Sequence, residues 1–502
     1  MVQFTTTDAH RATAVVDSVE SQVEAALDWL RPQLLDWARG MQGGQLTPAV
    51  FFRLELSLVV LLRDFGRFLL ELLLNGCEGD GGLLPHDLIY EGQGYRRLGK
   101  KTRNAHVATL FGTICLWRFG YRFWEPLVKE SCIFPLELQL GLIVRATPAL
   151  ADYIGRQMAE AGSTQSRVLR QLKEEHGISM GVKRLRKLVW RISEGLSEHR
   201  QAAQVEELLR ILHMTDSSSG NRKPVLAVGR DGITLCEYQY RFFEVATTAT
   251  VTVFDRADKR LKTIYLAWRP ELGQSTMSQM LNSLLTEVLA QWPGPLPTLA
   301  YVADSGGKET SYFEDTLRRM CHPRTGAPLD WQRVVDFYHA AERVWAIAAA
   351  LFGQGTAKYW AWGRRMLRIL KGKPRGAKRV LHSAAALAPR RKMGKSRREE
   401  FRKACNYIRK RTKWMRYCEY KNRHIPLGSG ITEAACKTVF TQRLKLSGMR
   451  WKKIGAQHIL TLRTILLSNT WTATYAMTLS TQEPSLPIPY AAGRPKNGRK
   501  AA

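Results

Sequence analysis

Two aspartates in this sequence stand directly after segments that are predicted to form strands. Asp231 follows the apolar run Val225 to Gly229, and Asp304 follows the run Thr298 to Ala303. Carboxylates at the carboxyl ends of adjacent strands can point at one crevice, and hard oxygen ligands of this kind suit Mg²⁺. An aspartate after a strand is also commonly a turn residue or a helix N-cap. The combination of the two, rather than either aspartate alone, indicates metal chemistry.

A third carboxylate, Glu433, follows Asp304 by 129 residues in the segment LGSGITE at 427–433. The glycines permit a tight turn, and Ser429 or Thr432 could cap a helix that begins there. The alternative interpretation of Glu433 is a first-turn glutamate that interacts favourably with the helix dipole. If the new helix returns to the sheet, its glutamate completes a set of three carboxylates that could hold two divalent ions for phosphoryl transfer.

The segments between these acids predict one mixed sheet. Two further strands, Phe243 to Phe254 and Leu261 to Ala267, follow the first across the turn Asp255 to Asp258, so three antiparallel strands are expected. The rest alternates between helix and strand: a helix at 275–291, the strand at 298–303, a helix at 310–320 and a last strand at 332–335. This βββαβαβα order is that of an RNase H-like domain.

The charge of the chain indicates a polyanionic partner. Its 502 residues carry 76 Lys+Arg against 44 Asp+Glu, a formal net charge of +32, and residues 364–421 hold 22 of the basic residues against three acids. An excess of this size attracts nucleic acid at long range. The 45% hydrophobic content excludes a disordered chain, and the eight cysteines show no zinc-ligand spacing, which fits reduced thiols.

Several basic segments are candidates for DNA contact. A helix at 165–175, the turn His176 to Ile178 and a second helix opening near Ser179 predict a helix-turn-helix, although a basic αα-hairpin explains the same residues. Basic runs with aromatic side chains also occur in the later part of the chain. The predicted DNA-binding residues are Lys183, Arg184, Arg186, Lys187, Arg409, Lys410, Arg411, Lys413, Arg443, Lys445, Arg450 and Trp451.

Four motifs carry a resemblance to a known family: TLFGT at 109–113, FPLE at 134–137, DFYHA at 336–340, and GSGITE through GMRW at 428–451. They resemble the bacterial insertion-sequence transposases of the Kra type, distant relatives of the Mutator-like group. The resemblance covers most of the chain. It implies a DDE transposase with an RNase H-like core interrupted by a helical insertion, and Asp231, Asp304 and Glu433 as its triad.

Related transposases also carry an Asp/Cys-x-x-His motif after the second acid, and Asp336 and His339 match it. One interpretation gives this pair a part in arranging DNA near the metals. The other makes Asp336 the cap of the next helix and gives His339 a hydrogen bond in the core. Asp336 is also the substitute for Asp304 as a metal ligand.

The expected organisation is a multidomain α+β or α/β chain, with mostly helical DNA-binding regions before the core. The predicted parts are a helical region at 1–75, a small mixed region at 76–160, a possible helix-turn-helix at 161–220, the first part of the core at 221–352, a basic helical insertion at 353–427, the last part of the core at 428–475 and a basic flexible tail at 476–502. The apolar stretch Leu56 to Leu74 is interrupted by charges, so we expect a core helix and not a membrane span.

The predicted activity is cleavage at transposon ends and joining to target DNA with two Mg²⁺ or Mn²⁺ ions. The expected partners are the terminal inverted repeats, target DNA and a second copy of the chain in a homodimer or higher oligomer on DNA. No membrane partner is expected, and the expected location is the bacterial cytoplasm, at the nucleoid. Two alternatives stay open: an RNase H-like nuclease that cuts without joining, and a sequence-specific DNA-binding protein derived from a transposase.

Overall fold

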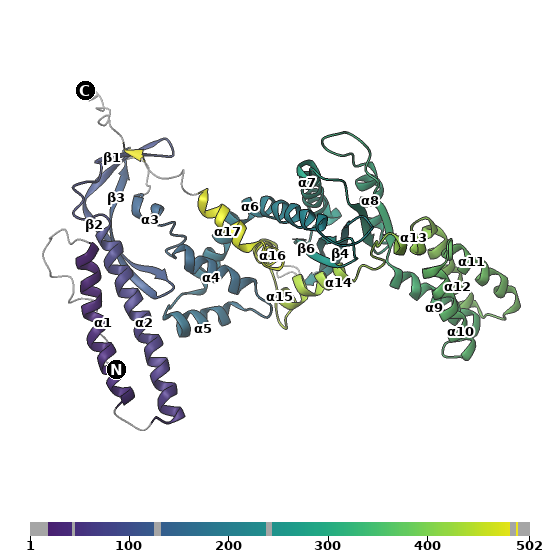
Figure 1. Cartoon of the computed structure of the whole chain (residues 1–502), viewed down its shortest axis with the longest axis horizontal. Helices are drawn as coiled ribbons and strands as arrows, with labels where there is room; N and C mark the ends of the chain where they lie inside the picture. The colour runs from purple at the N-terminus through teal and green to yellow at the C-terminus, as the bar shows by residue number, and fades with distance from the viewer. Residues whose placement is uncertain (1–18, 43–45, 125–131, 237–242, 482–487, 490–502) are drawn as a thin grey trace. The chain divides into compact units, whose positions relative to one another are not determined.

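The computed structural model describes residues 19–42, 46–124, 132–236, 243–481 and 488–489 (Figure 1). The chain divides into two compact units, Met1–Met158 with Thr164–Ile192 and Ala476–Ala502, and Ala159–Ser163 with Ser193–Tyr475. Both units combine helices with a sheet, so the α+β class is confirmed. Most of the predicted flexible tail lies outside the described residues.

The first unit opens with two long helices, α1 (Val19–Gln42) and α2 (Pro48–Gly76). Thr47 caps α2 because its side chain accepts a hydrogen bond from the Val50 amide. The predicted helix over 56–74 is confirmed, because α2 covers all of these residues. The expectation that this helix is buried in the core is wrong. Glu71 is the one buried residue of α2 among those described.

A small antiparallel sheet follows the two helices, with the strand order β3-β2-β1-β9. The β-branched and aromatic residues around His106 to Phe119 predict a short hairpin or small sheet, and the structure contains a longer hairpin there, formed by β2 and β3. Its strands and the helices that follow are β1 (Asp87–Tyr90), β2 (Gln93–Thr109), β3 (Gly112–Phe123), β9 (Ile488–Pro489), α3 (Pro135–Gln139), α4 (Pro148–Ala159), α5 (Gln165–His176) and α6 (Val182–Asp216).

The predicted helix-turn-helix segment contains two helices, but the second differs from the prediction. α5 ends at Gly177, whose positive φ of 65° suits glycine at a helix end. α6 begins at Val182 rather than near Ser179 and continues to Asp216, into the second unit. With 35 residues, α6 occupies most of the second half of the predicted helix-turn-helix region at 161–220.

The second unit is built on a five-stranded sheet with the order β6-β5-β4-β7-β8. β4 pairs antiparallel with β5 and β5 antiparallel with β6, whereas β7 lies parallel to both β4 and β8. The strands and the helices between them are β4 (Val225–Cys236), β5 (Phe243–Phe254), β6 (Arg260–Trp268), α7 (Ser275–Gln291), β7 (Thr298–Ala303), α8 (Gly307–Asp315) and β8 (Gln332–Val335).

Alternate residues of the central strands point into two separate cores, because successive side chains of a strand face opposite sides. Leu226 and Val228 of β4 pack with α6, α7 and α8. Val225 and Ala227 pack on the other side, with the helices that follow β8. The middle of the sheet is therefore buried on both faces, which fixes its register and leaves its strand ends for polar residues.

The helices that follow β8 form a cluster of their own beside the sheet (Figure 1). They are α9 (Phe337–Phe352), α10 (Ala357–Gly372), α11 (Gly376–Leu387), α12 (Lys395–Arg411) and α13 (Tyr417–Asn422). The chain then returns to the sheet through α14 (Gly430–Ala435), a π-helical turn (Cys436–Thr441) and α15 (Gln442–Leu444), and ends with α16 (Lys453–Leu467) and α17 (Trp471–Ser480).

Candidate active site

Asp231 lies inside a strand and not after one. β4 continues through Asp231 to Cys236, and Asp231 stands opposite Thr248 of β5. The expected strand end at Gly229 is wrong, because Asp231 and Gly232 form no turn and Gly232 is paired with Thr247 in the ladder. The pairing of β4 with β7 nevertheless stops at Val228, so Asp231 lies beyond the point where these two strands run side by side.

Asp304 follows β7 directly, as predicted. The last pair between the two parallel strands is Val228 with Tyr301, and each aspartate comes three residues after its member of that pair. Parallel neighbours in register lie close together, which places Asp231 and Asp304 at the same end of the sheet. One oxygen of Asp304 accepts a hydrogen bond from the Gly306 amide at 2.9 Å.

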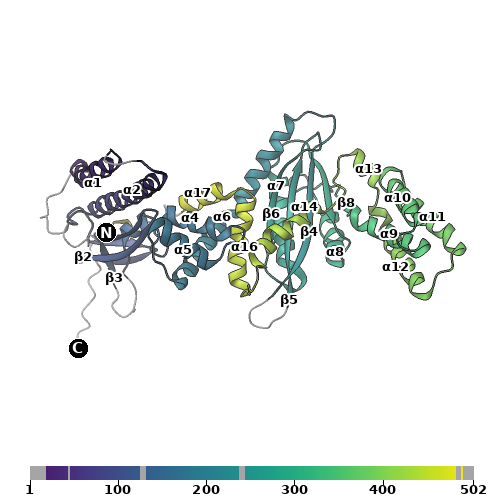
Figure 2. The ribbon, with the colours of Figure 1, turned by 90° about the horizontal axis from the view of Figure 1, so that it is seen from below.

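Glu433 reaches this end of the sheet because α14 packs directly on β4 and β5 (Figure 2). A Cβ atom on Gly229 would overlap the Thr432 hydroxyl. The Oγ1 atoms of Thr432 and Thr250 lie 2.7 Å apart in a buried hydrogen bond between the helix and β5. Thr432 is the residue before Glu433, so this close approach fixes where the glutamate stands. Thr432 does not cap the helix, contrary to one expectation.

Asp304 and Glu433 lie close enough to Asp231 for their charges to act on its pKa. Burial raises the pKa of Asp231, and the charges of Asp304 and Glu433 raise it further. Hydrogen bonds from the Gly232 amide and from the Cys436 thiol, whose Sγ lies 3.3 Å from Oδ2, act in the opposite direction. Two further carboxylates therefore lie near Asp231. A bound cation would stabilise such a cluster of negative charges.

Replacing Asp231 with Asn should raise the melting temperature of the metal-free protein at neutral pH. Because the folded-state pKa of Asp231 lies above the unfolded value, its stabilising contribution is complete at low pH and is lost as pH rises through the folded pKa. Asn carries no charge, so the gain over wild type should be small near pH ~4 and larger near pH ~7. Thermal melts in EDTA measure it, and a lower melting temperature at neutral pH would contradict the assignment.

Asp336 and Ser429 connect α9 to the loop before α14. Asp336 is fully buried and is the N-cap of α9, where Oδ1 accepts from the Tyr338 amide at 2.6 Å and the His339 amide at 3.0 Å. Its Oδ2 accepts from the Ser429 amide and lies 2.8 Å from the Ser429 hydroxyl. That hydroxyl lies 2.7 Å from Glu433 Oε1, so it can donate its proton to either carboxylate. Ser429 thereby holds Glu433 and makes no side-chain cap for α14.

His339 stands beside Glu433 rather than in the core. Its Nε2 lies 3.8 Å from Glu433 Oε1, and its Nδ1 lies 3.5 Å from Glu342 Oε2. The interpretation of Asp336 as the cap of α9 is confirmed. The expected hydrogen bond of the His339 side chain in the core is wrong, because this side chain is partly exposed. His339 is partly exposed and accessible to a ligand of the acid cluster.

Replacing Asp336 with Asn should destabilise the fold by about 2–4 kcal/mol, because one of its carboxylate oxygens becomes an NH₂ group that cannot accept from a buried backbone amide. Either orientation of the new amide leaves the cap of α9 or the Ser429 amide without an acceptor. Urea unfolding measures the loss. The matched control is Asp258→Asn in the exposed turn before β6, which should change stability by less than about 0.5 kcal/mol; equal effects would contradict the role given to Asp336.

A fourth acid at the site, Glu309, was not predicted. Burial raises its pKa first, and the charges of Asp304 and Asp231 raise it further, against a hydrogen bond from its own amide and the charge of Arg230. A Cβ on Gly306 would overlap Glu309 and touch Asp304, so this glycine lets α8 fold back over the second aspartate. The pair of glycines between the two acids is the signal that the sequence offered.

Arg230 supplies positive charge behind the acids. Its side chain is buried, with guanidinium nitrogens 3.1 Å from Ser278 Oγ and 3.3 Å from Gln274 Oε1, and it lies 4.4 Å from the centre of the Tyr312 ring. The aromatic face and the two polar partners from the start of α7 hold it in place. Its charge acts against the effect of burial on the pKa of Glu309.

The donor set fits divalent ions with hard-oxygen preference. Asp231, Asp304 and Glu433 offer carboxylate oxygens, and nearby Glu309 offers a fourth group. In the part of the chain that the structure describes, no three His, Cys, Asp or Glu side chains are already arranged in a metal-binding geometry. Glu433 is turned to Ser429, and Asp304 to the Gly306 amide, so each would rotate to bind an ion.

The predicted DNA-binding residues divide by exposure. Those on the surface are Lys183, Arg186, Lys187, Arg409, Lys410, Lys413, Lys445 and Arg450. Two others are held by the protein: Arg184 donates to three backbone carbonyls, and Arg411 donates to the carbonyls of Tyr407 and Ser305. Trp451 is partly buried and donates to the Leu444 carbonyl at 2.9 Å.

Arg443 requires a correction, because it is 1% exposed and cannot face DNA from this position. Burial lowers its pKa to about 10, and the nearby charge of Arg463 acts in the same direction. Its guanidinium lies 5.4 Å from the centre of the Trp451 ring. Arg443 of α15 thus lies in the interior, in the segment that follows the helix of Glu433, and helps to hold that segment in place.

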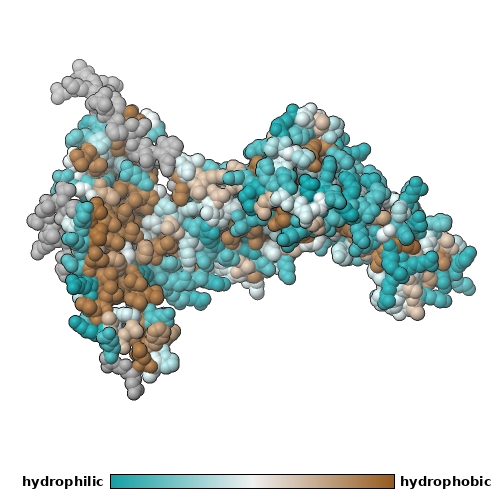
Figure 3. All heavy atoms as spheres, viewed as in Figure 1, coloured by the Kyte–Doolittle hydropathy of each residue, from teal (hydrophilic) through white to brown (hydrophobic). Residues whose placement is uncertain are grey.

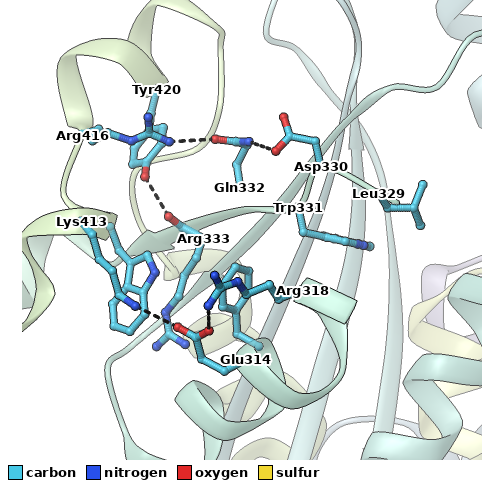
Figure 4. A pocket seen from close by; sticks show the side chains of 12 residues that line it. Glu314, Arg318, Leu329, Asp330, Trp331, Gln332, Arg333, Lys413, Arg416 and Tyr420 are labelled. Atoms are coloured by element: carbon cyan, nitrogen blue, oxygen red, sulfur yellow. Dashed lines mark hydrogen bonds and ion pairs between the residues drawn. The ribbon is translucent and has the colours of Figure 1, made fainter. Parts of the chain in front are cut away.

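A separate hollow of about 330 Å³ lies between α8 and the segment before α13 (Figure 4). Glu314 pairs there with Arg318 at 2.6 Å and with Lys413 at 3.0 Å. The buried guanidinium of Arg333 lies 4.3 Å from the centre of the Trp414 ring. Arg318, Lys413 and Arg333 thus already have partners within the chain. The residues that line the hollow do not include Asp231, Asp304 or Glu433, so it is separate from the acid site.

Neither the protein-family models nor the curated proteins that were searched contain a match to the sequence. Within the described ranges, none of the helices combines the length and the apolar character needed to cross a membrane.

Proposed function

We propose that this chain is a DNA transposase of the DDE type, with an RNase H-like core and Asp231, Asp304 and Glu433 as its triad. The observation that carries the proposal is that the charges of Asp304 and Glu433 both reach Asp231, although the three acids are separated by 73 and 129 residues in the sequence. Such convergence is what two-metal phosphoryl transfer requires.

Topology supports the same proposal. Three antiparallel strands followed by two parallel ones, in the order β6-β5-β4-β7-β8, agree with the RNase H-like arrangement expected from the sequence. The helices α10 to α13 stand between the last strand and Glu433, where a helical insertion is expected. A catalytic core of this kind can also serve a nuclease, so the fold alone does not separate cutting from joining.

Two Mg²⁺ or Mn²⁺ ions held by the triad would activate the attacking oxygen and stabilise the leaving oxygen of a phosphodiester. Asp231, Asp304 and Glu433 would hold these ions through their carboxylate oxygens. Ser429 orients Glu433, and His339 can donate to Glu433 or to a phosphate oxygen nearby. The exposed Lys445 and Arg450, in the segment after α14, offer charge for the DNA backbone.

A strand-transfer assay on DNA bearing the element's own ends tests this function. Wild type with Mg²⁺ should cut at the end and join the free 3′-hydroxyl to a target plasmid. Cut ends without joined products would favour the RNase H-like nuclease. Specific binding without cutting under Mg²⁺ or Mn²⁺ would favour the DNA-binding protein.

A further inference from the structure

The first two helices expose an unusually large apolar surface. Brown side chains cover much of the helix pair in Figure 3, and on α2 they include Phe52, 61% exposed, and Val59, 56% exposed. Other exposed apolar side chains of the pair are Val19, Val23, Leu27, Leu35, Phe51, Leu56, Val60 and Leu62. We call this set, with Phe52 and Val59, the α1–α2 face.

α1 and α2 pack against each other through the sides that face one another. The Trp37 indole donates to the Leu54 carbonyl at 2.9 Å, and the rings of Trp29 and Phe68 lie 5.5 Å apart. The outer sides stay uncovered by the described residues. A helix that is apolar on nearly all sides is normally buried, and a contiguous apolar patch on a water-exposed surface marks an interaction site.

The charge of residues 19–76 indicates which kind of partner the α1–α2 face binds. Residues 19–76 hold five arginines against seven acids, a net charge of −2, whereas the whole chain carries +32. This region therefore lacks the excess that would draw DNA, and it offers two copies of a strongly basic chain a place to meet without repulsion. An apolar face of low charge is the kind of surface that is complementary to itself.

The α1–α2 face extends along most of α1 and the first half of α2. Its residues run from Val19 to Leu35 and from Phe51 to Leu62, which gives lengths of about 25 Å and about 17 Å at a rise of about 1.5 Å per residue. With each helix about 10 Å wide, the face measures roughly 400 Å² per copy, so two copies would bury about 800 Å² in total, a size typical of small, reversible interfaces.

We propose that the α1–α2 face binds the α1–α2 face of a second copy, giving a homodimer that forms without DNA. Two hairpins packed face to face bury both apolar surfaces in a four-helix arrangement with twofold symmetry. This pairing does not depend on the chemistry of the acid cluster. It differs from an assembly that two DNA ends bring together.

Light scattering coupled to size-exclusion chromatography of the full chain without DNA tests the proposal. Wild type should be a dimer at low micromolar concentration. The double variant Phe52→Glu with Val59→Glu should dissociate roughly 100-fold more readily, because each copy would place two charges in an apolar interface. The matched control is Leu83→Glu, at a fully exposed apolar residue of the same unit, which should remain dimeric.

The proposal would be overturned if wild type is monomeric at every concentration. It would also be overturned if the double variant is folded and dimerises like wild type. A photocrosslinking residue at Val60 in a mixture of light and heavy copies avoids reliance on the double variant's folding. Crosslinks between copies should fall within residues 19–76. Crosslinks between copies that fall only elsewhere would also overturn the proposal.

Discussion

Asp231→Asn, Asp304→Asn and Glu433→Gln should each reduce DNA cutting and joining by about a thousandfold or more, because residues that act as one unit cannot substitute for one another. End binding should stay within about twofold of wild type, since DNA affinity comes mainly from basic residues elsewhere. Single-turnover cleavage in Mg²⁺, with gel-shift binding measured on the same preparations, gives both quantities.

Glu342→Gln is the control for these variants. Glu342 lies on α9 beside His339, yet it is not among the groups that perturb Asp231. It should retain at least about half of the wild-type rate. If Glu342→Gln loses as much activity as the triad variants, or if an Asp304→Asn variant cuts normally while Asp336→Asn at equal folding does not, the triad is assigned wrongly.

Gly229→Ala should be the most damaging change that leaves every polar group in place. The added Cβ would overlap the Thr432 hydroxyl and would lie 3.1 Å from Thr250 Oγ1, so α14 must move off the sheet. Overpacking of this kind costs about 1–3 kcal/mol. The movement also displaces Glu433, and a misplacement of about 1 Å can lower a rate by about 100-fold.

Gly430→Ala separates this steric argument from a general sensitivity of the GSGITE segment. A Cβ on Gly430 meets no atom within 4 Å, although Gly430 lies only two residues from Thr432. It should fold and cut like wild type. Equal losses in Gly229→Ala and Gly430→Ala, in unfolding midpoint and in cleavage rate, would contradict the close approach of α14 as the feature that places Glu433.

The sequence predicted the sheet well because its strands carry strong local signals. The segments 243–254, 298–303 and 332–335 match β5, β7 and β8 residue for residue. The end of β4 was missed because Asp231-Gly232 resembles a turn. After it, Ile233 and Leu235 alternate with Thr234 and Cys236, the pattern of a half-buried strand.

Long-range packing accounts for what the sequence could not predict. A basic residue such as Arg443 in this helical segment is typical of a DNA-facing surface, but the chain folds back so that Trp451 and Arg463 lie beside it in the interior. The apolar run 56–74 predicts a helix correctly, yet periodicity does not say what covers that helix. Ser429 could be recognised as a polar residue at a helix start, whereas its link from Asp336 to Glu433 depends on how α9 and α14 meet.

The central claim is that Asp231, Asp304 and Glu433 form one divalent metal site, and iron-directed cleavage of the protein tests it most directly. Fe²⁺ replaces Mg²⁺, ascorbate and peroxide generate hydroxyl radicals at the bound ion, and mass spectrometry locates the chain breaks. We expect breaks near residues 231, 304 and 433 that excess Mg²⁺ suppresses and that Asp231→Asn abolishes. Breaks confined to other segments, or breaks near these acids that neither Mg²⁺ nor Asp231→Asn reduces, would contradict it.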